Sequence, residues 1–137
     1  MLCHTTKCRV IYGDTDHRGI ACHANYLRWF EIGRTEMFRS LSLTYKEVER
    51  KGLFLPVARA CCDFISPARY DDLLSIETRL DPTFKAGVRF DYRVTVDGEN
   101  RVSATGFTRH ACVNAHGKVV RPPAFIRKII QTASKEI

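Results

Sequence analysis

The sequence predicts an α+β domain in which one antiparallel sheet curls around a single long helix. A strongly apolar helical pattern runs from Tyr26 to Leu41, and a two-residue alternation takes over from Leu53 onward. The chain has 137 residues and a hydrophobic content of 45%, which is enough for one core. We therefore expect residues 1–137 to form one domain.

The long helix is expected to be buried over most of its circumference. One face is made of apolar or small residues at helical spacing, namely Tyr26, Phe30, Gly33, Met37 and Leu41. Trp29, Ile32 and Phe38 widen this face. Only a wrapping sheet or a helix bundle can cover such a helix. A first strand is predicted at 5–12, and a short second helix at 44–51 that Gly52 ends.

The second half of the chain reads as antiparallel strands. Alternating runs occupy 74–80 and 88–96, and a long strand is predicted at 101–113. Turns are expected at 85–87 and at Asp97-Gly98, and a short helix after Pro122-Pro123. A single sheet would leave one face and its edges bare, so we expect at least a dimer, with the site near a subunit boundary.

The composition limits the kinds of function that the chain can have. The net charge is +7, but the basic residues are dispersed, which argues against nucleic-acid binding. The charge is compatible with binding of a phosphorylated small molecule, or with a basic surface that only faces solvent. No apolar run suits a membrane span or a secretion signal, so a cytoplasmic protein is expected. The six cysteines contain no CxxC pair and the histidines are scattered, so no metal site is predicted and most thiols should be free.

The polar loop at 12–25 is the main candidate for chemistry. Asp14 and Asp16 lie just ahead of the apolar helix, together with His23. A helix start offers free N–H groups that hold an oxyanion, and a carboxylate beside it can attack or can activate water. Both aspartates could instead be loop or capping residues.

Two segments resemble a known family. The run Asp14-Thr15-Asp16-x-x-Gly19-Ile20-x-x-His23-Ala24-Asn25-Tyr26-Leu27-Arg28-Trp29-Phe30-Glu31 is similar to the signature of hotdog-fold thioesterases, in particular the 4-hydroxybenzoyl-CoA thioesterase family and the YbgC-type acyl-CoA thioesterases. The run at 67–78 resembles a second stretch of that family. The resemblance covers roughly 6–130.

The resemblance implies a five-stranded antiparallel sheet around a long central helix, in homodimers or homotetramers with active sites at the dimer interface. It implies that Asp16 is the catalytic carboxylate and that His23 assists it. A backbone N–H near the helix start would polarise the carbonyl. The oxyanion and substrate-positioning residues expected on this basis are Gly19, Ile20, Asn25 and Tyr26, facing Phe54 and Leu55.

The implied activity is hydrolysis of an acyl-CoA thioester, with no cofactor beyond the CoA of the substrate. Asp16 would act as general base or as nucleophile, and the sequence does not separate the two. Candidate CoA-binding residues are Arg18, Lys85 and Arg89. The alternatives are an acyl-carrier-protein thioesterase and a non-catalytic acyl-CoA-binding dimer. Cys22 stands where the family often has an aromatic residue, which also raises a Cys22–His23 nucleophile.

Overall fold

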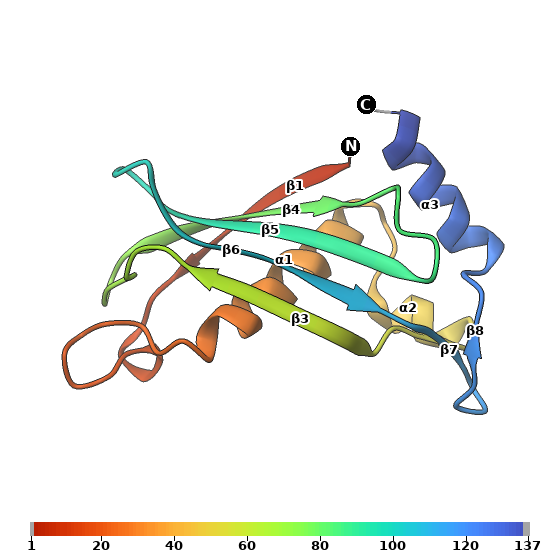
Figure 1. Ribbon diagram of the computed structural model, residues 1–137, viewed down its shortest axis with the longest axis horizontal. Helices are drawn as coiled ribbons and strands as arrows, with labels where there is room; N and C mark the ends of the chain where they lie inside the picture. The colour runs from red at the N-terminus through yellow and green to blue at the C-terminus, as the bar shows by residue number, and fades with distance from the viewer. Residues whose placement is uncertain (1, 136–137) are drawn as a thin grey trace.

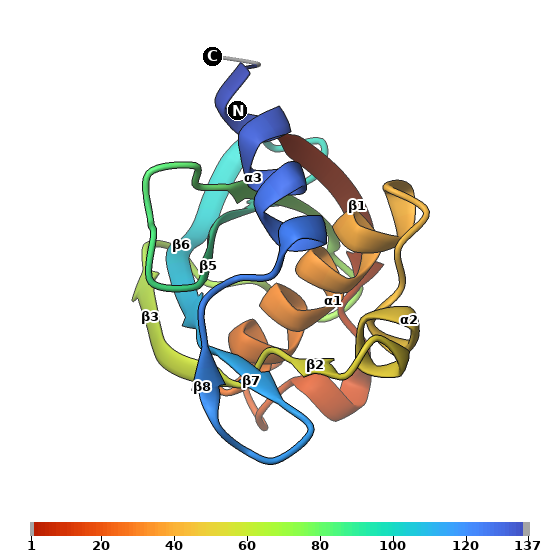
Figure 2. The same cartoon turned by 90° about the vertical axis from the view of Figure 1, so that its right-hand side faces the viewer.

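The sheet predicted from the sequence is confirmed, and it wraps around helix α1 (Asn25–Ser40), as Figures 1 and 2 show. The computed structural model describes residues 2–135. The five antiparallel strands lie in the order β1–β4–β5–β6–β3. Their bounds are β1 (Cys3–Arg9), β3 (Val57–Phe64), β4 (Leu73–Leu80), β5 (Val88–Val96) and β6 (Arg101–His110).

Helix α1 packs its apolar face directly on the sheet. Phe30 stacks on Tyr92 of β5 with ring centroids 4.2 Å apart, and Trp29 and Met37 are fully buried. A methyl group at Gly33 would overlap side chains of β4, so glycine is what lets the helix approach the sheet this closely. The buried face predicted from the helical spacing is therefore the one that the sheet covers.

Two further helices flank this core. Helix α2 (Tyr45–Arg50) begins at Thr44, whose hydroxyl accepts the Glu47 N–H at 3.3 Å, and Gly52 follows it with φ of +79°. Helix α3 (Ala124–Lys135) begins directly after the two prolines and crosses the end of the sheet (Figure 2). No helix among residues 2–135 is both long and apolar enough to cross a bilayer.

The predicted ends of two strands were wrong. The first strand ends at Arg9 rather than Tyr12, because Val10 exchanges hydrogen bonds with 71–72 and residues 12–14 form a 3₁₀ turn, η1 (Tyr12–Asp14). The last long strand breaks at Ala111, where the chain leaves the main sheet. Beyond the break it forms a second, unpredicted three-stranded sheet of β2 (Leu53–Phe54), β7 (Cys112–Asn114) and β8 (Val119–Val120).

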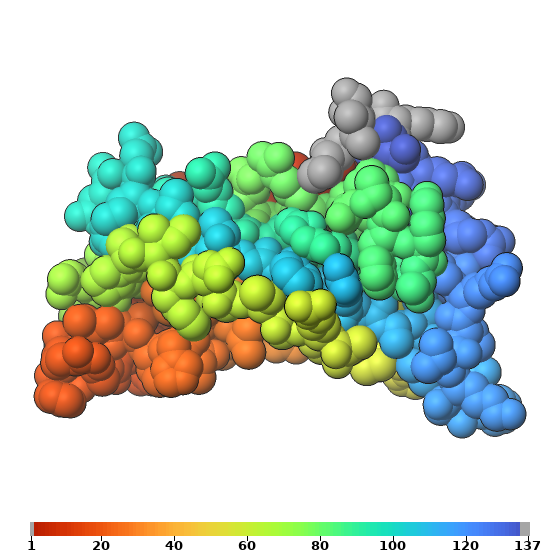
Figure 3. Space-filling view, in the orientation of Figure 1, coloured from red at the N-terminus to blue at the C-terminus, as the bar shows by residue number. Residues whose placement is uncertain are grey.

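Strand β3 is a bare edge of the main sheet. Among residues 2–135 it pairs only with β6, and its residues run as an uncovered strip across the face seen in Figure 3 (yellow-green). Val57 at its start and Phe64 and Ile65 at its end are exposed. An edge with exposed apolar ends is suited to pairing with another strand.

Candidate active site

The loop between β1 and α1 is anchored by a buried carboxylate. Asp14 is 5% exposed, and it accepts hydrogen bonds from the Ile11 N–H at 3.0 Å and from Arg28 Nη2 at 2.5 Å. Its carbonyl oxygen accepts from the Cys22 N–H at 2.8 Å and from Asn25 Nδ2 at 2.7 Å. The two ends of the loop and the first turn of α1 are thus tied together through one residue.

The carboxylate of Asp16 lies in a tight turn of its own. The Asp16 N–H donates to the Ile20 carbonyl at 2.9 Å, and the Gly19 N–H donates to the Asp16 carbonyl at 3.0 Å. Gly19 has φ of +76°, a conformation that residues other than glycine seldom adopt. A bridge between Ile20 and Arg69 then holds this turn against the segment that follows β3.

Both oxygens of Asp16 are occupied by hydrogen-bond donors. Oδ1 accepts from the backbone N–H groups of Arg18 at 2.8 Å and Ile20 at 3.4 Å. Oδ2 accepts from the Arg18 side chain, from Nε at 3.1 Å and from Nη2 at 2.7 Å. The side-chain hydrogen bond from Arg18 is the main cause that lowers the pKa of Asp16 to about 2. Asp16 is therefore ionised at neutral pH.

A hollow of about 390 Å³ opens beside Asp16. It is bounded by the loop, the start of α1 and the end of β3, and its lining includes Asp16, Arg18, Ile20, Cys22, His23, Tyr26 and Phe64. The Phe64 ring packs edge-on against both His23 and Tyr26, with centroids 6.2 and 5.2 Å away. The Tyr26 hydroxyl lies 2.7 Å from Ser103 Oγ, so this tyrosine presents its ring to the hollow and keeps its polar atom satisfied.

The expected site residues separate into two groups here. Asp16, Ile20, His23 and Tyr26 share the hollow, whereas Asn25 anchors the loop through Asp14. The N–H groups of Gly19, Ile20, Asn25 and Tyr26 all donate hydrogen bonds within the loop, so they are not free oxyanion donors. Among the hydrogen bonds of residues 2–135, the N–H groups of His23 and Ala24 have no acceptor, and these two remain available at the helix start.

Phe54 and Leu55 are not beside Asp16 within one chain. They line a different hollow of about 440 Å³, next to Arg34 and Tyr45. The Leu55 carbonyl accepts a hydrogen bond from the buried ring of His110, whose Nδ1 lies 2.9 Å away. These residues meet the Asp16 hollow only if a second chain supplies them.

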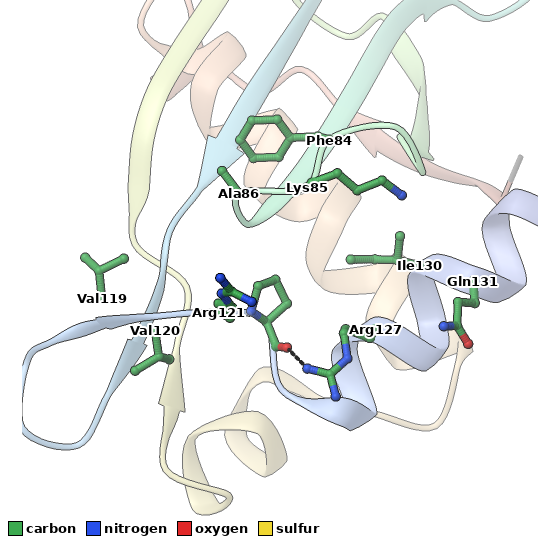
Figure 4. Close-up of a pocket in the computed structure, with 10 residues that line it drawn as sticks. Phe84, Lys85, Ala86, Val119, Val120, Arg121, Arg127, Ile130 and Gln131 are labelled. Atoms are coloured by element: carbon green, nitrogen blue, oxygen red, sulfur yellow. Dashed lines mark hydrogen bonds between the residues drawn. The ribbon is translucent and has the colours of Figure 1, made fainter.

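A third hollow, of about 780 Å³, is the basic one (Figure 4). It lies at the opposite end of the molecule from the Asp16 loop, between α3 and the connection from β4 to β5. Lys85, Arg121 and Arg127 line it together with apolar residues, and none of the lining residues is acidic. Sequence reasoning named Lys85 but missed both arginines, because single basic residues on either side of a proline pair carry no signal until the fold groups them.

The other two expected CoA-binding residues are engaged elsewhere. Arg18 is paired with Asp16, as described above. Arg89 lies against Asp91 at 3.0 Å and Asp81 at 3.6 Å, with its guanidinium over the Phe107 ring. No hydrogen bond between Cys22 and His23 is found in the described part of the chain. Nor do residues 2–135 bring together a group of three or more histidine, cysteine or acidic side chains that could hold a metal ion.

Comparison with known proteins identifies the family. The model of the thioesterase-like superfamily matches residues 10–130. The acyl-CoA thioesterase YbgC of Haemophilus influenzae is 35% identical over 122 residues, covering 88% of this chain and 87% of that protein. A hypothetical protein from Thermus thermophilus superposes with a TM-score of 0.86 at 30% identity, covering 96% of this chain and 97% of that one.

A more distant solved structure agrees in fold. The 1,4-dihydroxy-2-naphthoyl-CoA thioesterase of Synechocystis has a TM-score of 0.84 at 21% identity, covering 98% of this chain and 97% of that one. The resemblance inferred from the two sequence runs is therefore confirmed, and the chain belongs to the thioesterase-like superfamily as a hotdog-fold protein of the YbgC type.

Proposed function

We propose that this protein hydrolyses acyl-CoA thioesters to the free acid and CoA, with Asp16 as the catalytic carboxylate. The observation that carries the proposal is the ionised Asp16 carboxylate and His23 lining one hollow at the start of α1. Membership of the family supports it, as do the relatives that are named acyl-CoA thioesterases.

The reaction needs little from the protein beyond this pair. A thioester carbonyl is electrophilic, and a thiol with a pKa of roughly 8.5 departs readily as thiolate. Asp16 either takes a proton from the water that attacks the carbonyl, or attacks with its own oxygen to give an anhydride that water then opens. In both routes the carbon–sulfur bond breaks, water supplies the acid oxygen, and the thiolate acquires a proton.

His23 and the helix start supply the remaining roles. The His23 ring lines the hollow, where it can orient the attacking water or protonate the departing thiolate. The N–H groups of His23 and Ala24 are the donors that we assign to the developing oxyanion. This assignment replaces the N–H groups of Gly19, Ile20, Asn25 and Tyr26.

A homodimer through β3 would complete the site. Two copies of one strand that pair antiparallel place the start of each beside the end of the other. The segment at 54–56 lies just before β3, and Phe64 lies at its end. Pairing along this edge would therefore bring the partner's Phe54 and the partner's Leu55 toward the Asp16 hollow.

The same pairing suggests where CoA phosphates bind. It places the basic hollow of one chain at the same end as the Asp16 hollow of the other, because the two hollows lie at opposite ends of each chain. Lys85, Arg121 and Arg127 offer an ammonium and two guanidinium groups to phosphate. We therefore place the nucleotide end of CoA there and withdraw Arg89, which two aspartates already hold.

The deciding experiment is release of free thiol from short, medium, long and aromatic acyl-CoAs by wild type beside Asp16→Asn. We expect a preferred acyl class and a fall in kcat of roughly 10²-fold or more in the variant. Equal turnover by the variant would remove Asp16 from catalysis. If wild type hydrolyses none of these esters, the same acyl groups are offered on acyl carrier protein, and turnover would identify an acyl-carrier-protein thioesterase. If these are not hydrolysed either, equilibrium binding of acyl-CoA would identify a non-catalytic binding dimer.

A further inference from the structure

We propose that Arg18 is a latch on Asp16, which an anionic group of the substrate withdraws to free the carboxylate. The proposal rests on the proposed function and adds a condition to it, namely that the unliganded site is held inactive. The anionic group is a phosphate of CoA or a carboxylate on the acyl chain, since a guanidinium binds both in the same forked geometry.

The latch follows from counting the donors on Asp16. An ionised carboxylate has about four acceptor positions. Four N–H groups reach these two oxygens, two of them on Oδ1 and two on Oδ2. No position is left for the proton of an attacking water, and no lone pair is free to attack a carbonyl carbon. Either route of hydrolysis therefore requires at least one donor to leave.

The donors on the two oxygens of Asp16 differ in kind, and this difference decides which donor leaves. Those on Oδ1 are backbone N–H groups of the tight turn, whereas those on Oδ2 come only from the Arg18 side chain. Withdrawal of that side chain frees Oδ2 completely, while Oδ1 stays bonded. The carboxylate would then keep its orientation as it becomes reactive.

The pair is exposed enough to open. The side chains of Arg18 and Asp16 are 65% and 29% exposed, and ion pairs of this kind contribute little to stability. Within the described part of the chain no other acidic residue lines the hollow, so the hollow itself offers Arg18 no second carboxylate. A competing anion must arrive with a ligand. Opening also removes the main cause of the low pKa of Asp16, so the carboxylate becomes a stronger base when the substrate is in place.

The test compares thioesters with and without the anionic groups. The best acyl group from the panel is offered as its CoA ester and as its N-acetylcysteamine ester, which has no phosphate. A third substrate is an N-acetylcysteamine ester whose acyl chain ends in a carboxylate. The enzymes are wild type, Arg18→Gln and, as matched control, Arg69→Gln, which removes an exposed arginine beside the same turn.

We expect Arg18→Gln to raise kcat/KM for the neutral truncated ester by roughly threefold or more, because Oδ2 is then free without a ligand. We expect its preference for the CoA ester over the truncated ester to fall, while Arg69→Gln matches wild type. In wild type, a gain from CoA alone identifies phosphate as the releasing group, and a gain from the terminal carboxylate identifies the acyl chain.

An unchanged or lower rate of Arg18→Gln on the neutral truncated ester would overturn the latch. That result differs from a failure of the proposed function, in which wild type releases no thiol from any ester. It differs also from a general charge effect, which would appear equally in Arg69→Gln.

Discussion

Two aspartates that stand two positions apart have different surroundings. The residue between them, Thr15, is extended, with φ of −110° and ψ of 156°. In a regular strand, side chains two positions apart point to the same face. Here the chain turns at once, so Asp14 is buried against Arg28 and Asp16 lines the hollow. We infer that Asp14 supports the loop and that Asp16 reacts.

This division predicts opposite effects for the same chemical change. Asp14→Asn leaves Arg28 without its carboxylate and should lower the free energy of unfolding by about 1–2 kcal/mol. Asp16→Asn should leave thermal stability nearly unchanged, because its partner is exposed, while kcat falls. Thermal unfolding and acyl-CoA hydrolysis, measured on both variants, check this. Equal loss of stability in the two would contradict the assignment.

The part of the site that is local in sequence could be predicted. Asp16, His23 and Tyr26 surround one helix start, so the apolar pattern of α1 and the polar loop before it were sufficient to group them. The N–H groups expected to hold the oxyanion already donate inside the loop, and the sequence does not show which N–H groups such hydrogen bonds leave free. Arg121 and Arg127 join Lys85 only through the tertiary fold.

At the scale of elements, helices were predicted more accurately than strand ends. The 3.6-residue pattern of a helix and the residues at its ends, such as Thr44 and Gly52, depend only on residues close together in the sequence. A strand ends where its partner ends, as β1 does when Val10 bonds to 71–72. The small sheet was missed because β2 and β8 each have two residues, which is too short for a period to show.

One hydrogen-bond chain joins the end of β6 to the segment before β3. The Leu55 carbonyl can only accept, so His110 donates from Nδ1 at 2.9 Å, and its Nε2 accepts from Thr108 Oγ1 at 2.8 Å. The Tyr92 hydroxyl lies 2.6 Å from Thr108 Oγ1 and can donate to it. Burial is the main cause that lowers the pKa of His110 to about 4; the hydrogen bond to Leu55 acts against it, and the nearby Arg34 adds to it. The ring is therefore neutral when it holds Leu55.

This histidine should make stability depend on pH. Its pKa is about 4 when folded and 6.5 when unfolded, so the unfolded chain binds the proton first. The stabilisation is complete above pH 6.5 and is lost as the pH falls through 4. Between pH 7 and pH 4, wild type should lose about 2–3 kcal/mol more than His110→Asn, which keeps a donor for Leu55 but does not titrate.

Urea unfolding at a series of pH values measures this difference directly. The His110→Asn variant is the reference that accounts for the carboxylates, which titrate in both proteins. Parallel curves for the two proteins would show that His110 is not the group responsible.

At the scale of the whole molecule, the two edges of the sheet are unlike. Strand β1 has charged residues along its edge, including Lys7 and Arg9, of which Lys7 is paired with Asp97. Strand β3 also carries two charged residues, Arg59 and Asp63, but exposed apolar side chains bound it at both ends, Val57 and Phe64. Exposed apolar ends favour pairing with another strand, so a dimer should form along β3.

Val57→Asp tests both the dimer and the site that it completes. In the antiparallel pairing that we propose, Val57 would lie toward the end of the partner's strand, so a carboxylate there would be desolvated among apolar side chains. We expect the mass in solution to fall from two chains or more to one, and acyl-CoA turnover to fall with it. Thr5→Asp adds the same charge at an exposed position of β1 and should change neither. Light scattering after gel filtration, with activity measured on the same fractions, distinguishes the outcomes. A Val57→Asp protein that is monomeric and fully active would show that one chain holds the complete site. A wild-type protein that is itself monomeric would contradict the β3 interface.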